Sequence, residues 1–355
     1  MEYKRLGDIA TYINGYPFKP EDRGLTGLPI IRIQDLTGNS YDLGFYNGNY
    51  PERIEINDGD VLISWSASLG VYIWNKGKAL LNQHIFKVAF DKCEVNKQFF
   101  VYAVQYKLQE MGAKAHGATM KHIVKKDFDN TAIPFPALEE QEKIAQTMNR
   151  ISRIISDRQQ QLQKLDELVK ARFVEMFGDP ELNPRGLPVL PWNAVFLTTT
   201  GKLDSNAMVE NGRYPFFTCA KESYKIDSYA FDCEALLLAG NNAAGIYDVK
   251  HYKGKFNAYQ RTYVLRLMNE KWSYILFKRQ LEDKLQYLQS QSKGTNTRYL
   301  TLGILNELRF VVPPVAEQEQ FAVFVEQTDK SKVVVQKALD EAQTLFDSLM
   351  QKYFE

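Results

Sequence analysis

The segment PALEEQEKIAQTMNRISRIISDRQQQLQKLDELVKARFVEMFG, from Pro136 to Gly178, keeps one hydrophobic period along its length. Its apolar residues recur at alternating steps of four and three, with one polar interruption at Arg158, and charged or amide residues fill the other positions. This spacing is typical of a heptad seam. Because no internal Gly or Pro breaks it, the segment predicts one helix of about 40 residues, about 60 Å long. Such a narrow apolar stripe must be covered by a partner helix.

The last 43 residues repeat this pattern at a shift of 177 residues, so that Glu140-Gln141-Glu142 returns as Glu317-Gln318-Glu319. Two amphipathic helices could align by chance, but the same shift carries Gly117–Ile123 onto Gly294–Leu300 and Gln83 onto Gln260. The chain therefore reads as two copies of one unit, each a globular part followed by a long helix. The residues expected in the seam between the helices are Ile144, Met148, Ile151, Ile155, Leu162, Leu165, Val169, Phe321, Val325, Val335, Leu339 and Phe346.

The composition agrees with a two-domain globular protein. A chain of 355 residues accommodates two such units, and 45% hydrophobic residues can fill sizeable cores. The net charge of +1 argues against a uniformly basic binder but leaves room for a local basic face. The three cysteines have no C-x-x-C spacing, which fits thiols in a reducing compartment. With neither a signal peptide nor an apolar stretch of membrane-spanning length, we expect a cytoplasmic protein that does not contact a membrane.

Both copies alternate short apolar runs with turn residues before a helix. In the first copy we expect strands at 28–33, 60–65, 70–74 and 85–90, and a helix at 96–111. In the second copy the matching segments are 214–217, 235–239 and 259–263, with a helix near 272–288. The expected fold class is α+β, with mixed α/β domains in tandem at 1–135 and 179–312 and long helices at 136–178 and 313–355.

The sequence carries no recognisable catalytic constellation. It lacks the phosphate loop of nucleotide hydrolases, the G-x-S-x-G elbow, H-E-x-x-H and paired Cys/His zinc spacing. None of the four histidines has a ligand-like neighbour three or four residues away. The loop Gly240–Gly245 fits an ordinary turn as well as a ligand loop. We therefore predict no catalytic residue and no metal site.

Loops in both copies are rich in groups that contact nucleic acid. Basic, hydroxyl and amide side chains bind phosphates or base edges, and aromatic rings stack. Taken singly, each residue is explained as well by a solvated loop, so the prediction depends on recurrence at equivalent places. In the first copy the predicted DNA-binding residues are Ser64, Trp65, Ser66, Ser68, Asn82, Gln83, His84, Lys114, His116, Thr119, Lys121 and His122. In the second copy they are Lys221, Lys225, Asn241, Asn242, Tyr259, Gln260, Arg261, Lys293, Asn296, Thr297 and Arg298.

Over its whole length the chain resembles the DNA-specificity subunits of type I restriction-modification systems. The resemblance is carried by Leu6–Ile9 (LGDI), Gly59–Ile63 (GDVLI), Leu81–Phe86 (LNQHIF), Gly117–Lys121 (GATMK) and the helix entries Pro136–Ile144 and Pro313–Phe321. The second copy departs from the pattern at Phe196–Thr198 and Tyr259–Arg261.

The resemblance implies two target-recognition domains, each followed by a long helix, with the helices paired in an antiparallel coiled coil. A pseudo-twofold axis leads to the same arrangement, because it places the two domains at opposite ends of the helix pair. A rod with a reader at each end suits a bipartite target in double-stranded DNA, and the helices would set the spacer.

The resemblance also implies partners that supply the chemistry. Two adenine methyltransferase subunits would hold S-adenosylmethionine, and two restriction subunits using ATP and magnesium are left open. This chain itself would hold no cofactor and would not be an enzyme.

Two other functional classes are weighed against this interpretation. A coiled-coil scaffold with protein-binding domains would tolerate acidic or apolar loops, whereas the loops at 114–122 and 291–298 are basic or neutral. A self-contained methyltransferase would need an Asn/Asp-Pro-Pro-Phe/Tyr motif, which does not occur. The DNA sequence, the spacer length and the division of loop residues between bases and phosphates depend on loop geometry and DNA shape, which the pattern does not encode.

Overall fold

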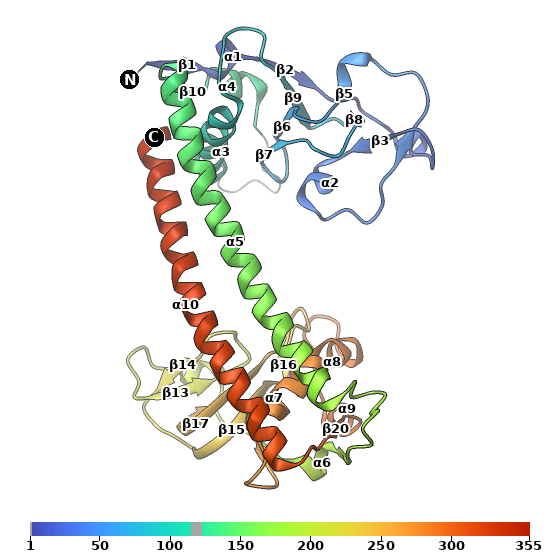
Figure 1. Cartoon of the computed structure of the whole chain (residues 1–355), viewed down its shortest axis with the longest axis vertical. Helices are drawn as coiled ribbons and strands as arrows, with labels where there is room; N and C mark the ends of the chain where they lie inside the picture. Colours follow the sequence, from blue (N-terminus) through green and yellow to red (C-terminus); the bar gives the residue numbers. More distant parts are fainter. Residues whose placement is uncertain (1, 115–122) are drawn as a thin grey trace. The chain divides into compact units, whose positions relative to one another are not determined.

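The computed structural model describes residues 2–114 and 123–355, and these residues form two compact units (Figure 1). Unit 1 comprises Met1–Gln159 and Lys337–Glu355, and unit 2 comprises Gln160–Gln336. Each unit thus contains one globular region together with parts of both long helices, α5 (Leu138–Phe177) and α10 (Val315–Phe354).

The globular region of unit 1 is built from short strands and four helices in the described residues. The strands are β1 (Tyr3–Arg5), β2 (Thr11–Asn14), β3 (Leu28–Ile31), β4 (Phe45–Tyr46), β5 (Glu55–Ile56), β6 (Val61–Ser64), β7 (Gly70–Ile73), β8 (Ala79–Leu81), β9 (Ile85–Ala89) and β10 (Ala132–Pro134). The helices are α1 (Leu6–Ile9), α2 (Ile33–Thr37), α3 (Lys97–Lys114) and α4 (Lys125–Asn130).

Two sheets organise this region. The antiparallel sheet has the order β2-β9-β6-β7, and the mixed sheet has the order β4-β3-β8-β5. Strands β3 and β8 run parallel, with Ile31 beside Leu81. Helix α3 covers the first sheet, because its buried Phe100 lies in one apolar cluster with Val61 of β6 and Val88 of β9.

The globular region of unit 2 joins the corresponding strands into a larger sheet. Its strands are β11 (Val189–Pro191), β12 (Phe196–Thr200), β13 (Tyr214–Phe217), β14 (Tyr224–Ile226), β15 (Phe231–Ala239), β16 (Asn241–Asn242), β17 (Val249–Ala258), β18 (Thr262–Leu267), β19 (Arg298–Tyr299) and β20 (Arg309–Val311). Its helices are α6 (Trp192–Val195), α7 (Tyr274–Asp283), α8 (Leu285–Gln291) and α9 (Leu302–Asn306). The main sheet has the order β12-β18-β15-β17-β13-β14, while β16 pairs separately with β19.

Strand registers confirm that the two units are copies of one plan. Tyr12 of β2 lies opposite Val88 of β9, and Thr198 of β12 lies opposite Leu265 of β18. Val88 and Leu265 are related by the shift of 177 found in the sequence. Tyr12 and Thr198 are related by a shift of 186. The difference arises between β3 and β6, where unit 1 has the longer connection and accommodates α2.

The C-terminal end of each long helix packs against the start of the other long helix. In unit 1, Phe354 of α10 packs with Ile144 of α5, and its ring centroid lies 5.3 Å from that of Phe99 in α3. In unit 2, Phe177 of α5 takes the equivalent place, 5.6 Å from the ring of Phe321 in α10. Each globular region is therefore sealed by the end of the helix that belongs to the other copy.

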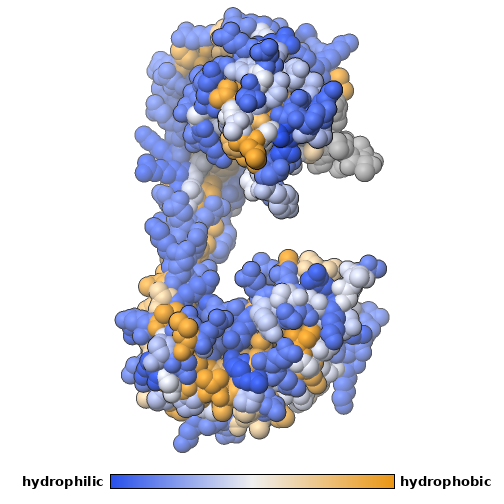
Figure 2. All heavy atoms as spheres, turned by 90° about the vertical axis from the view of Figure 1, so that its right-hand side faces the viewer, coloured by the Kyte–Doolittle hydropathy of each residue, from blue (hydrophilic) through white to orange (hydrophobic). Residues whose placement is uncertain are grey.

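The predicted seam residues face inward to different degrees. Buried members are Ile144, Met148, Ile151, Val169 and Phe321, and half-buried members are Ile155, Leu162, Leu165, Val325, Val335, Leu339 and Phe346. The helix faces seen in Figure 2 are mainly hydrophilic, as a narrow apolar stripe requires. A continuous coiled-coil seam through the central turns stays a prediction.

A buried glutamine ties each long helix to its globular region. In unit 1, Gln141 accepts a hydrogen bond from the Asn96 backbone N–H at 3.0 Å and donates to the Pro136 carbonyl at 2.8 Å. In unit 2, Gln318 accepts from the Ser273 N–H at 3.0 Å and donates to the Pro313 carbonyl at 2.8 Å. The repeated Glu-Gln-Glu motif is thus a structural joint.

Replacing Gln141 by alanine should destabilise unit 1 by about 2–4 kcal/mol, because it leaves two backbone groups near a buried site without partners. We expect the thermal unfolding midpoint, followed by circular dichroism, to fall by several degrees. The matched control is Gln163→Ala, because Gln163 is exposed on the same helix and bonds only to Glu167 among the described residues. Equal midpoints for the two variants would contradict this role of Gln141.

The long helices begin and end within two residues of the predicted bounds 136–178 and 313–355. The single helix predicted near 272–288 is wrong, because the chain forms α7 and α8 there. At the break, the Lys284 N–H donates to the Leu281 carbonyl three residues back, which tightens the turn and redirects the chain.

Candidate nucleic-acid interface

Three segments with predicted DNA-binding residues meet in unit 1. The Trp65 N–H donates to the His84 carbonyl at 3.2 Å, and the Ile123 N–H donates to the Trp65 carbonyl at 3.0 Å. We call the segments Trp65–Ser68 and Asn82–His84, together with Ile123, the loop cluster of unit 1. These bonds are made by the backbone, so they do not depend on which side chains the loops carry.

Unit 2 repeats these bonds at equivalent positions. The Gly240 N–H donates to the Arg261 carbonyl at 2.9 Å, and the Leu300 N–H donates to the Gly240 carbonyl at 2.8 Å. The loop cluster of unit 2 comprises Gly240–Asn242 and Tyr259–Arg261, together with Leu300. The recurrence seen in the sequence is therefore a recurrence of backbone geometry.

In each unit a parallel strand pair brings the segments that follow its two strands together. The carboxyl ends of parallel neighbours lie at the same sheet edge, so the loops that follow them emerge side by side. In unit 1, the N–H of Asn82, just after β8, donates to the carbonyl of Ile31 at the end of β3 at 3.0 Å. In unit 2, the Tyr259 N–H donates to the Phe217 carbonyl at 2.9 Å.

The structure places the predicted residues of unit 1 in different environments. Ser64 is fully buried, and its hydroxyl donates to the Ser68 carbonyl at 2.6 Å, which favours a role in shaping the loop. Ser66 is also buried. By contrast, Ser68, Asn82, Gln83 and His84 line an open pocket of about 440 Å³.

Trp65 is held by aromatic neighbours. Its ring stacks on Phe86, with centroids 5.6 Å apart, and lies edge-on to His84 at 4.9 Å. Its indole Nε1 donates to Asn14 Oδ1 at 3.4 Å. These contacts hold the ring in place at the side of the loop cluster.

The predicted DNA-binding residues His116, Thr119, Lys121 and His122, and the side chain of Lys114, lie outside the part of the chain that the structure describes.

In unit 2, Asn242 of β16 pairs with Arg298 of β19, so two predicted loops become one small sheet. The Arg298 guanidinium is half-buried and donates through Nη1 to the Gln289 carbonyl at 3.1 Å. Gln260 and Arg261 line a cavity of about 110 Å³ with Tyr299.

The other predicted residues of unit 2 lie along its surface or beside these loops. Tyr259 is half-buried, as is Asn241, which pairs with Tyr299 in the β16–β19 sheet. The remaining predicted residues are exposed, namely Lys221, Lys225, Lys293, Asn296 and Thr297.

The pocket of unit 1 also contains residues that the sequence patterns did not single out. Besides Ile33 of α2 and Ala67, these are Arg32, Gln34, Thr37 and Asn39. The sequence does show polar residues directly after strand β3. This pattern indicates a site only once β3 is known to run parallel to β8. The α2 segment therefore joins the candidate interface through tertiary structure.

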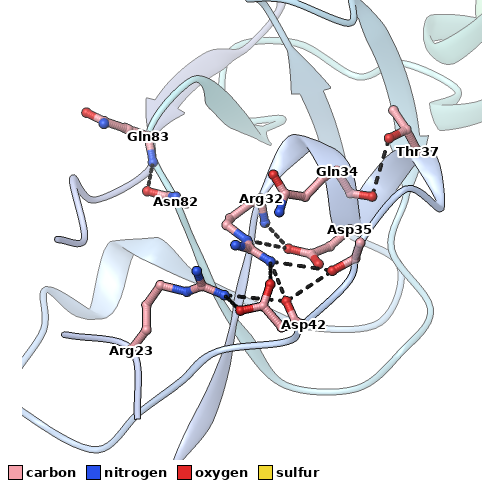
Figure 3. A network of polar contacts seen from close by, with 9 residues as sticks. Arg23, Arg32, Gln34, Asp35, Thr37, Asp42, Asn82 and Gln83 are labelled. Carbon is pink, nitrogen blue, oxygen red and sulfur yellow. Dashed lines mark hydrogen bonds and ion pairs between the residues drawn. The ribbon is translucent and has the colours of Figure 1, made fainter. Parts of the chain in front are cut away.

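Ion pairs hold the α2 segment (Figure 3). Arg32 Nε lies 3.2 Å from Asp35 Oδ2, and its Nη2 contacts the backbone carbonyl and, at 3.4 Å, the carboxylate of Asp42. Arg23 Nη2 donates to the same carboxylate at 2.7 Å. Burial raises the pKa of the Asp42 carboxyl, but the hydrogen bonds and charges of the two arginines outweigh it, so the pKa lies below its ordinary value. Asp42 therefore stays ionised near neutral pH.

The face of unit 1 that bears α2 and β3 is largely hydrophilic (Figure 2). Among the described residues there is no group of three or more His, Cys, Asp or Glu side chains arranged to hold a metal ion. The described helices are also too short or too polar to cross a membrane.

Comparisons with known proteins agree with this architecture. A family model described as the type I restriction modification DNA specificity domain matches residues 1–167 and 195–342. The chain is similar to the type I restriction enzyme EcoDI specificity subunit of Escherichia coli, with 39% identity over 141 residues, which cover 38% of this chain and 30% of that protein. It is also similar to the EcoBI specificity subunit of Escherichia coli, with 28% identity over 168 residues, covering 46% of this chain and 35% of that protein. These matches thus span about a third of each relative's length.

Solved structures show the same fold. The S subunit of a type I restriction-modification system from M. genitalium superposes with a TM-score of 0.64 at 16% identity, covering 100% of this chain and 96% of that chain. At this identity the likeness concerns the fold alone.

Proposed function

Because the chain belongs to the type I restriction modification DNA specificity domain family, we propose that it is a sequence-specific subunit that reads a bipartite site in double-stranded DNA. Unit 1 reads one half-site and unit 2 reads the other. The observation that carries this proposal is the pair of loop clusters, which share backbone hydrogen bonds and differ in side chains. A common scaffold with different exposed residues is what two readers of different sequences require.

The long helices act as the spacer between the readers. In unit 1 the end of α10 packs on the start of α5, and in unit 2 the end of α5 packs on the start of α10. Lys332 of α10 also pairs with Asp166 of α5, with Nζ and Oδ1 2.7 Å apart. These contacts support an antiparallel coiled coil with pseudo-twofold symmetry, which would present the two loop clusters to separate half-sites.

Catalysis belongs to partner subunits in this proposal. The chain recruits two methyltransferase subunits, which bind S-adenosylmethionine, and it leaves sites for restriction subunits that use ATP and magnesium. The missing methyltransferase and nucleotide-binding motifs in the sequence support this division of labour. A scaffold that binds only proteins is less favoured, because the loop clusters expose amide and basic residues such as Gln83, Gln260 and Arg261.

The test is to express the chain with its partner methyltransferase in cells that lack other adenine methylation, and to sequence the methylated positions. We expect one bipartite motif with a fixed spacer, present only when both proteins are made. If the two proteins copurify and no new motif appears, the proposal is wrong.

Replacing Arg261 by alanine should weaken DNA binding by the assembled complex. Arg261 is exposed in the loop cluster of unit 2, where a guanidinium can bind a phosphate. For a phosphate contact, affinity should fall nearly equally for all sequences, and the slope of log affinity against log salt should shrink by about one. Lys271→Ala is the control, because Lys271 is exposed beyond the far end of β18. Unchanged affinity and salt slope in the Arg261 variant would exclude this contact.

A further inference from the structure

The pocket of unit 1 shows two marks of a functional site beyond its polar lining. Ala67 and His84, which both line it, have positive φ angles of 57° and 72°. Only one other described residue besides glycines, Asn183, has a positive φ. Such conformations are strained for residues other than glycine, and they cluster at active sites and ligand-binding sites. In addition, His84 Nδ1 is buried without a hydrogen-bond partner among the described residues.

Arg32 beside this pocket is already committed to protein partners. Its side chain is only 14% exposed, and both Asp35 and Asp42 bind it. Arg23 and Arg32 are balanced by the two carboxylates, so the group carries no net charge that would attract a phosphate. An arginine at a nucleic-acid interface usually suggests a phosphate or guanine contact, but this arginine is used inside the protein.

The guanidinium of Arg32 also orients Gln34. The Gln34 side chain is satisfied when its Oε1 faces Arg32, where it accepts from Nη1 and Nη2 at 3.0 Å each, because two donor groups cannot bond to each other. In that orientation the amide oxygen is occupied and the NH₂ group is available to the pocket. Gln34 then offers hydrogen-bond donors only, which an amide seldom does.

Building on the proposed function, we propose that Gln34 reads a base in the half-site of unit 1, and that Arg32 is a positioning residue that fixes its amide. The NH₂ group donates to an acceptor on a base edge in the major groove, such as N7 or O6 of guanine. This assignment is specific to unit 1. In unit 2 the shift of 186 places Thr218 where Arg32 stands, and the structure has no helix there.

The test compares the methylated motif of the wild-type complex with those of Gln34 variants. Gln34→Ala should relax one base position of one half-site by about tenfold or more, and it should leave the other half-site and the spacer unchanged. Gln34→Glu has the same shape but presents acceptors, so the same position should shift toward cytosine, whose N4 donates. An unchanged motif in both variants would overturn the inference while leaving the proposed function intact. A wild-type complex without any motif would overturn both.

Arg32 variants separate positioning from direct contact. We expect Arg32→Ala to relax the same base position as Gln34→Ala, with an unchanged salt slope of binding. Asp35 still caps the Arg32 backbone N–H at 2.8 Å, so α2 should persist, and an unchanged unfolding midpoint would verify this. Asp42→Ala loosens the same guanidinium from its exposed side and serves as a second variant if Arg32→Ala fails to fold. Arg53→Ala, an exposed arginine elsewhere in unit 1, is the control.

The salt dependence decides between the two roles of Arg32. A uniform loss of affinity for all sequences, with a salt slope smaller by about one, would show that Arg32 binds a phosphate and would overturn the positioning role.

Discussion

Removing one heptad from each long helix should shorten the unread spacer of the DNA target by up to about three base pairs. The deletion of 158–164 together with 335–341 keeps the apolar period of both helices, because each loss is one full heptad. The helix pair becomes shorter by about 10 Å, at about 1.5 Å per residue. Since DNA rises about 3.4 Å per base pair, this length corresponds to about three base pairs.

The measurement is the methylated motif of cells that carry the shortened chain with its partner methyltransferase. Both half-sites should keep their sequences, because the loop clusters are unchanged. Deleting 158–164 alone is the control, since it removes the register between the helices and should abolish activity. An active double deletion that methylates the original site with its original spacer would show that the helices do not measure the DNA.

A charge in the predicted seam should abolish assembly with the methyltransferase. Leu162 and Leu339 are both half-buried on the apolar stripe, and an aspartate there must lose part of its hydration. If the helices pair as proposed, we expect Leu162→Asp or Leu339→Asp to separate them. The assembled complex should then disappear from size-exclusion chromatography.

Exposed leucines on the same helices provide matched controls. Leu168 of α5 is 48% exposed and Leu345 of α10 is 50% exposed, so Leu168→Asp and Leu345→Asp introduce the same charge outside the stripe. These variants should assemble like the wild type. Normal assembly by Leu162→Asp and Leu339→Asp would mean that the central helix turns are not paired as proposed.

Several features could be predicted from the sequence alone because they depend on local periodicity. The heptad spacing located α5 and α10 to within two residues, and alternating apolar runs located strands such as β6 and β9. The shift of 177 revealed the two copies, and it holds in the register of β9 and β18. Periodicity predicts which residues are buried, but it does not predict which residues pack against them.

Long-range register decided the candidate site. The Trp65 and His84 segments meet because β6 and β9 pair antiparallel, and the Asn82 segment lies beside the end of β3 because β3 and β8 run parallel. No local pattern encodes either pairing. Ser64 is buried in β6 between β7 and β9, and Gln34 of α2, which follows β3, lines the pocket.

The sequence therefore determined that this protein has two alike units with long helices and polar loops. Only the tertiary structure decided which loop residues meet, because strand pairing over many residues is a property of the folded chain. It also decided that each globular region is closed by the helix end of the other copy. Phe354 and Phe177 pack at equivalent places, against residues that are distant from them in the sequence.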